Sequence, residues 1–198
     1  MAKSDPAAAK KERNKAIRWV VTIFFVTIVI SGASSLLSDI AMENSSTVVA
    51  FLILLLIILV GIIFDIIGMA VATADEKPFH SMAARKVPGA MESIALLRNA
   101  ERVSSICNDV VGDICGVISG AASATIAARI LSGFTFSWPQ IITLSMSALA
   151  AGLTVGGKAI GKSVAVNSCT AIVHGVGRIV YTLKHLPDLF RKKKKKKR

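Results

Sequence analysis

Long runs of apolar residues, separated by short polar or basic segments, dominate the sequence. Four runs are long enough to cross about 30 Å of hydrocarbon as helices; they extend over Ala16–Leu37, Thr47–Ala74, Val103–Phe134 and Trp138–Gly157. The first run follows a basic segment, as in a signal peptide, but it is longer than the usual apolar core of one and lacks a clear cleavage site. We therefore expect an uncleaved first helix and four membrane spans.

The pattern changes in two further segments, about 75–102 and 162–189. There, apolar residues recur at helical spacing among basic ones, as at Ile172, Ile179 and Leu183. Such a stripe is typical of an amphipathic helix that lies at the membrane interface. The sequence therefore predicts an all-α membrane protein, with four transmembrane helices plus amphipathic juxtamembrane helices.

Composition supports the same class of protein. Apolar residues make up 53% of the 198 residues, and charged residues only 18%, whereas soluble domains carry about 25% charged residues. A soluble domain of this size could not bury so much apolar surface. The numbers also exclude disordered, collagen-like and disulfide-rich chains.

Basic residues predict the orientation in the membrane. Six of the 24 lie at or before Arg18, five lie between Glu76 and Arg102, and twelve lie from Lys158 onward; the remaining one is Arg129. The two opposite loops, Ser38–Ser46 and Thr135–Ser137, contain none. Because basic loops stay in the cytoplasm, we expect a multi-pass protein of the cell membrane with both termini cytoplasmic.

The chain ends in eight consecutive basic residues that follow an amphipathic segment. Basic clusters in this position bind anionic lipids, and the absence of interleaved aromatic residues argues against a nucleic-acid partner. We therefore predict that the tail binds lipid through Arg191, Lys192, Lys193, Lys194, Lys195, Lys196, Lys197 and Arg198.

No enzyme signature stands out. The three histidines are scattered, and none is near a serine or cysteine in a nucleophile motif. The cysteines Cys107, Cys115 and Cys169 lie among apolar or small residues without CxxC spacing, so we interpret them as small hydrophobic residues rather than ligands or a disulfide. Binding or transport is expected rather than catalysis.

The informative polar residues are acids inside the predicted spans: Asp65, Asp109 and Asp113. Ionisable groups at this depth usually face a cavity, a partner or an ion. Asp109 and Asp113 are four residues apart and would share one α-helix face, and antiparallel packing would bring Asp65 to a similar depth. With the amide of Asn108, they would form an oxygen-rich site suited to Mg²⁺.

Two other interpretations of these acids stay open. Lys158 and Lys162, at the end of the fourth span, could neutralise one or two of them, or the acids could be protonated or lie at helix ends and interfaces.

Glycines repeat every four residues beside the acids, at Gly112, Gly116 and Gly120. This spacing lets membrane helices approach each other closely.

Three stretches resemble motifs of a known family over about Gly61–Leu189. They read Phe64-Asp65-Ile66-Ile67-Gly68, Pro88-Gly89-Ala90 followed by Ala95-Leu96-Leu97-Arg98-Asn99-Ala100-Glu101-Arg102, and Gly156-Gly157-Lys158-Ala159-Ile160-Gly161-Lys162-Ser163. In order and spacing they are similar to the transmembrane domain of the cyclin-M/CorC magnesium transporters. The resemblance implies the fold of that domain, a homodimer and a Mg²⁺ site.

The chain also departs from the family pattern. Asp65 stands where the family has serine, its two glutamates fall at Gly68 and Gly157, and its proline falls at Gly161. We expect four segments: a basic cytoplasmic N-terminus (1–15), an additional first transmembrane helix (16–38), a cyclin-M/CorC-like domain (47–189) that includes the interfacial helices (about 75–102 and 162–189), and a polybasic tail (190–198), without the family's cytoplasmic domains.

Two functions follow as hypotheses. The first is binding or transport of a divalent cation, expected to be magnesium, through Asp65, Asn108, Asp109 and Asp113. The second is a non-transporting membrane scaffold or regulatory subunit in which Lys158 or Lys162 neutralises the acids. A contact between Lys158 and an acid would favour the second, because a paired lysine fills the place of the cation.

Overall fold

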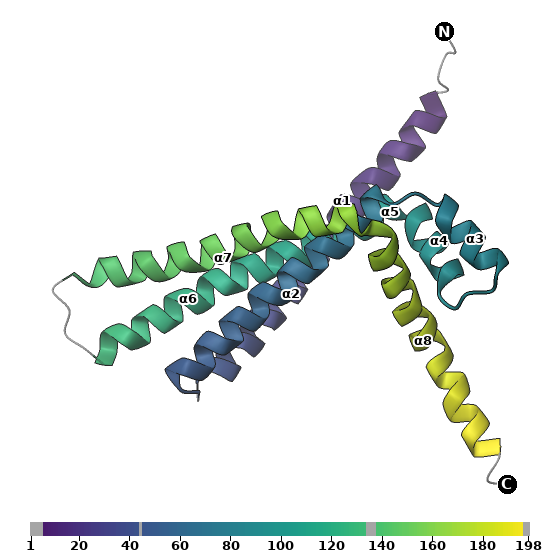
Figure 1. Cartoon of the computed structure of the whole chain (residues 1–198). Coiled ribbons are helices and arrows are strands. Elements are labelled where there is room, and N and C mark those ends of the chain that lie inside the picture. The colour runs from purple at the N-terminus through teal and green to yellow at the C-terminus, as the bar shows by residue number, and fades with distance from the viewer. Residues whose placement is uncertain (1–5, 44, 134–137, 196–198) are drawn as a thin grey trace.

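The computed structural model describes residues 6–43, 45–133 and 138–195 (Figure 1), and over these ranges the ordered elements are helices, with no strand. Within these ranges, four helical stretches are long and apolar enough to cross a membrane. They are α1 (Pro6–Glu43), α2 (Thr47–Thr73), the stretch Ala100–Gly133 and α7 (Pro139–Asn167). The predicted all-α fold with four spans is confirmed, and the chain is a multi-pass membrane protein.

The third span contains a change of helix type. It consists of α5 (Ala100–Ser105), the π-helix η1 (Ile106–Gly112) and α6 (Asp113–Gly133). A π-helix is a rare element that is frequent at functional sites. Helix α2 packs against η1, α6 and α7, and therefore lies at the centre of the bundle.

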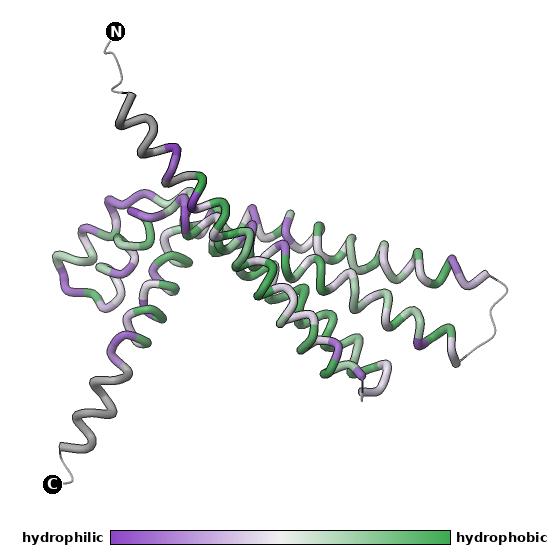
Figure 2. Tube along the Cα trace, turned by 180° about the vertical axis from the view of Figure 1, so that it is seen from behind, coloured by the Kyte–Doolittle hydropathy of each residue, from purple (hydrophilic) through white to green (hydrophobic). Residues whose placement is uncertain are grey.

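Buried side chains of α2 and α6 form an apolar core near one end of the bundle, with Met42 of α1. We call this end, where the short loops join the spans, the loop end. Outside this core, large apolar side chains of the spans stay exposed, for example Phe24, Leu52 and Leu144. Hydrophobic residues run along the whole bundle (Figure 2), as expected for helices surrounded by lipid.

The opposite end of the bundle carries three further helices: α3 (Lys77–Ala84), α4 (Ala90–Arg98) and α8 (Cys169–Lys195). We call it the basic end, because it carries the lysines and arginines of the segments 77–102 and 158–184. A second core joins these helices to the end of α2, with Phe79 fully buried. The amphipathic helices predicted within 75–102 and 162–189 are therefore present.

Some element bounds differ from the sequence-based expectation. Helix α1 begins at Pro6 and continues to Glu43, so most of the expected loop over 38–46 is helical. Helix α7 continues to Asn167, so the interfacial helix begins only at Cys169. Hydropathy alone does not indicate either extension, because the added helical residues include polar ones.

Arg129 explains the longer first helix. Its guanidinium donates hydrogen bonds to the carbonyl oxygen of Ser45, at 2.8 Å, and to that of Met42. Carbonyl groups at a helix C-terminus lack partners within the helix, and a cation there is favoured by the helix dipole. Arg129 of α6 thus caps α1 and ties the α1–α2 connection to the bundle.

Candidate functional site

The side of α2 that faces η1 and α6 carries small residues on either side of Asp65. A Cβ atom on Gly61 would lie 2.8 Å from the Cβ atom of Cys115, and one on Gly68 would lie 2.1 Å from Oδ1 of Asn108. Both distances are shorter than real Cβ contacts allow. Glycine at these positions therefore lets the third span approach α2 closely on both sides of Asp65.

Asp65 forms an ion pair with Lys158 of α7. Nζ of Lys158 lies 3.3 Å from Oδ1 of Asp65, and only 12% of the Asp65 side chain and 23% of the Lys158 side chain are exposed. Gly112 borders the pair, since a Cβ atom there would lie 3.3 Å from Nζ and 3.6 Å from Oδ1. The pair is thus enclosed between three spans.

Close packing of α7 on α2 positions the lysine. A Cβ atom on Gly157 would lie 2.2 Å from Cδ1 of Ile62, and one on Gly161 would lie 2.7 Å from Cγ1 of Ile66. These two glycines flank Lys158 in the sequence of α7. They let the backbone of α7 approach α2, so that the lysine reaches the carboxylate of Asp65.

Asn108 lies in the π-helix, next to the α2 turn that follows Asp65. Its Nδ2 donates a hydrogen bond to Oγ of Ser104, at 3.3 Å. Its Oδ1 is buried and accepts no hydrogen bond from any residue that the structure describes. A buried polar atom without a partner is unfavourable by about 1–3 kcal/mol, so this oxygen is an available acceptor for a donor or a cation.

The other two predicted acids point elsewhere. Asp109 is exposed and accepts a hydrogen bond from Oγ of Ser105, at 2.8 Å. Asp113 is also exposed, at the start of α6. Of the four predicted metal ligands, the structure therefore brings Asp65 and Asn108 to the interior and leaves Asp109 and Asp113 on the outer side of the bundle.

Among the described residues, no three histidine, cysteine, aspartate or glutamate side chains gather in a way that could hold a metal ion. The interior of the site instead combines one carboxylate, one ammonium and one amide oxygen without a partner, contributed by Asp65, Lys158 and Asn108. Lys162, the other lysine proposed as a counter-charge, is exposed.

Sequence reasoning missed two features of this site. The glycines opposite Asn108 and Ile62 could be read as general packing residues, but not as the positions that admit particular side chains. The π-helix has no sequence signature that we recognise.

The predicted lipid-binding tail falls largely outside the described residues. Lys196–Arg198 are not among them, and of Arg191–Lys195 only the backbone is described, as the end of α8.

Comparison with known protein families, with curated proteins and with solved structures finds no match to this chain. The resemblance to the cyclin-M/CorC transmembrane domain therefore remains a prediction from the sequence motifs.

Proposed function

We propose that this chain is a non-transporting membrane scaffold or regulatory subunit, in which Lys158 takes the place that a cation would take beside Asp65. The observation that carries the proposal is the 3.3 Å ion pair between these two residues inside the bundle. A cation that bound the carboxylate of Asp65 would first have to displace the ammonium group.

The strength of the pair supports this proposal. Two unit charges 3.3 Å apart attract each other by roughly 5 kcal/mol at an effective dielectric constant of about 20. An external cation would have to displace the ammonium group, and the ammonium already provides the attraction and the partial neutralisation that the carboxylate would otherwise seek from an ion. The resident ammonium thus competes with any cation for the carboxylate of Asp65.

A scaffold also needs a surface for assembly, and α6 and α7 offer one. Apart from the side that packs on α2, few residues of the membrane span of α7 are buried in the bundle. A Cβ atom on Gly116, Gly120, Gly152 or Gly156 would meet nothing within 4 Å. Because small residues four apart let membrane helices approach closely, we propose a homodimer that pairs these faces, with the exposed Asp113 at their edge.

The proposed orientation follows from charge. Basic residues gather at the basic end and in the tail, whereas Arg129 is the single lysine or arginine in the sequence between 103 and 157. We propose that the basic end and both termini are cytoplasmic in the cell membrane.

A second candidate function, binding or transport of a divalent cation such as Mg²⁺, is supported by a different observation. The buried Oδ1 of Asn108 has no partner among the described residues, and amide and carboxylate oxygens are preferred Mg²⁺ ligands. The resemblance to the cyclin-M/CorC family points the same way. In this case the site would bind its ion once the Lys158–Asp65 pair opens.

Thermal unfolding of the detergent-purified protein in a series of Mg²⁺, Mn²⁺, Ca²⁺ and Na⁺ concentrations separates the two candidates. A ligand that binds only the folded state raises its stability with the logarithm of the ligand excess over Kd. The scaffold proposal expects no selective shift in the wild type. It also expects that Lys158→Met gains a Mg²⁺-dependent shift while Lys162→Met, the exposed lysine one turn away, does not.

A selective Mg²⁺ shift of the wild-type protein that disappears in Asp65→Asn would contradict the scaffold proposal and support the cation candidate. Asp109→Asn serves as a further comparison, because its carboxylate lies on the outer side of the bundle.

A further inference from the structure

Helix α8 leaves the bundle at a wide angle (Figure 1) and is held there by α4. A Cβ atom on Gly177 would lie 2.2 Å from Oγ of Ser93 and 2.5 Å from the carbonyl oxygen of Gly89. The hydroxyl of Ser93 lies 3.2 Å from the carbonyl oxygen of Val173. This close contact of backbones fixes which side of α8 faces α4.

An ion pair extends the same contact. Nζ of Lys184 lies 3.9 Å from Oε1 of Glu92, and the Glu92 side chain is only 13% exposed. With Val173 and Gly177 buried, α8 is braced over about three turns. The direction of its remaining faces is therefore determined by the fold.

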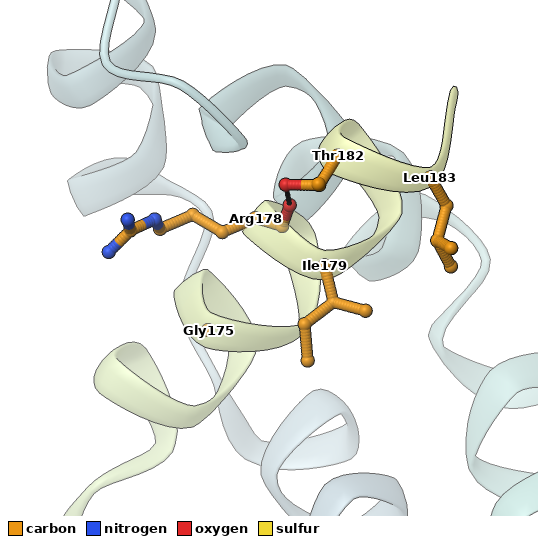
Figure 3. A pocket seen from close by; sticks show the side chains of 5 residues that line it. All are labelled: Gly175, Arg178, Ile179, Thr182 and Leu183. Carbon is orange, nitrogen blue, oxygen red and sulfur yellow. Dashed lines mark hydrogen bonds between the residues drawn. The ribbon is translucent and has the colours of Figure 1, made fainter. Parts of the chain in front are cut away.

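One of these remaining faces is apolar and has no partner in the chain as described. Ile179 is 61% exposed and Leu183 is 62% exposed. They border an open hollow of about 430 Å³, lined by Gly175, Arg178, Ile179, Thr182 and Leu183. Figure 3 shows Ile179 and Leu183 on the same side of the helix, with Arg178 extending in another direction.

Positive charge accompanies this apolar face. Arg178 and Lys184 are exposed on the same helix, and the sequence continues into eight consecutive basic residues, Arg191–Arg198. An exposed aliphatic stripe beside basic residues is complementary to an anionic lipid surface, where acyl chains take up the aliphatic groups and phosphates pair with the cations. A nucleic acid would satisfy the charge but leave Ile179 and Leu183 in water.

We propose that the Ile179–Leu183 face of α8 docks on an anionic phospholipid surface. The two aliphatic side chains enter the boundary of the acyl chains, and Arg178 and the basic run lie at the level of the phosphates. Since α4 braces α8 on another side, the docked helix holds the basic end at a set angle to the membrane. This proposal does not depend on whether the site at Asp65 binds a cation.

The test uses a tryptophan reporter in the full-length protein. Trp19 and Trp138 are the only two tryptophans, and both are replaced by phenylalanine. Leu183→Trp then introduces a single reporter on the proposed face. Met91→Trp is the matched control, because Met91 is 67% exposed on α4. Ile179→Trp is a second reporter in case the first variant does not fold.

The proteins are reconstituted into vesicles of phosphatidylcholine, with or without phosphatidylglycerol, and emission is measured with brominated acyl chains as quenchers. We expect a larger loss of emission at position 183 or 179 than at position 91. This loss should increase with phosphatidylglycerol and fall as salt screens the charges. Equal quenching at position 91, or no effect of phosphatidylglycerol, would overturn the proposal.

Two further outcomes would show that this face binds a partner other than lipid. If the tryptophan emission is blue-shifted but brominated lipid does not quench it, protein, such as a second copy of the chain, covers the face. Release of the reporter from quenching by an added oligonucleotide would show that nucleic acid competes for the same surface. Either result would overturn lipid docking.

Discussion

The ion pair between Lys158 and Asp65 makes the most decisive prediction, because each partner is expected to be destabilising without the other. Removing one partner of a fully buried pair typically destabilises by about 3–5 kcal/mol, and this pair is partly buried, with 12% of the Asp65 side chain and 23% of the Lys158 side chain exposed. Lys158→Met would leave the carboxylate of Asp65 unpaired, and Asp65→Asn would leave the ammonium of Lys158 unpaired. Each single variant should therefore be destabilised by about 1–3 kcal/mol.

The magnitude follows from the geometry. At 3.3 Å the attraction is roughly 5 kcal/mol at an effective dielectric constant of about 20, and the exposed fractions of 12% and 23% leave little water to screen it. In the double variant, neither charge remains. We expect the double variant to lie within about 1–2 kcal/mol of the wild type, as for buried pairs replaced by uncharged groups.

A double-mutant cycle measures this coupling directly. The free energy of unfolding is obtained for the four proteins by reversible denaturation in mixed micelles, followed by circular dichroism. Lys162→Met is the control for loss of a lysine on α7, and as an exposed change it should stay within about 0.5 kcal/mol of the wild type. Additive effects of the two single substitutions, within about 0.5 kcal/mol, would show that Lys158 and Asp65 are not energetically coupled.

Three further predictions concern close contacts. Arg129→Met should destabilise by about 3 kcal/mol, because two charge-assisted hydrogen bonds are lost, one to Met42 in the last turn of α1 and one to Ser45 in the connection to α2. Denaturation in micelles measures the loss, and an unchanged stability would contradict the capping role. Gly68→Ala should destabilise by about 1–3 kcal/mol, since its Cβ atom would lie 2.1 Å from the amide oxygen in η1. In Gly116→Ala the added Cβ atom would meet nothing within 4 Å, so the melting temperature of the monomer should stay nearly unchanged. Equal destabilisation by Gly68→Ala and Gly116→Ala would contradict this prediction. Gly177→Ala should loosen α8 from α4, because its Cβ atom would lie 2.2 Å from a serine hydroxyl of α4. Hydrogen exchange of α8 should therefore accelerate in this variant but not in Gly175→Ala, whose Cβ atom has open space.

Several features of the fold could be predicted from the sequence because they depend on local composition. The apolar lengths of the four spans match the thickness of a bilayer, whatever the neighbouring helices do. The amphipathic stripes around Ile94 and Ile172 likewise follow from helical periodicity. The ends of the helices were less predictable, since Arg129, far along the chain, donates a hydrogen bond to the carbonyl oxygen of Met42 in the last turn of α1.

The candidate site shows where such reasoning stops. Asp109 and Asp113 were expected to share one helix face at a depth similar to that of Asp65 and to form a site with it, but that expectation assumes a regular α-helix. Asp109 lies within the π-helix and Asp113 directly follows it, so their directions do not follow from the 3.6 residues per turn of an α-helix. Both acids are exposed, while Asn108 points to Gly68.

Entry into the membrane, the number of possible spans and the places where positive charge gathers can be inferred from the amino-acid sequence alone. These properties follow from the transfer of side chains between water and lipid, which each segment undergoes largely on its own. The pairing of Lys158 with Asp65 and the exposure of Ile179 become evident only in the folded chain. The reason is that such contacts depend on the rotation and approach of packed helices, set here by glycines such as Gly112 and Gly177, whose neighbours are distant in the sequence.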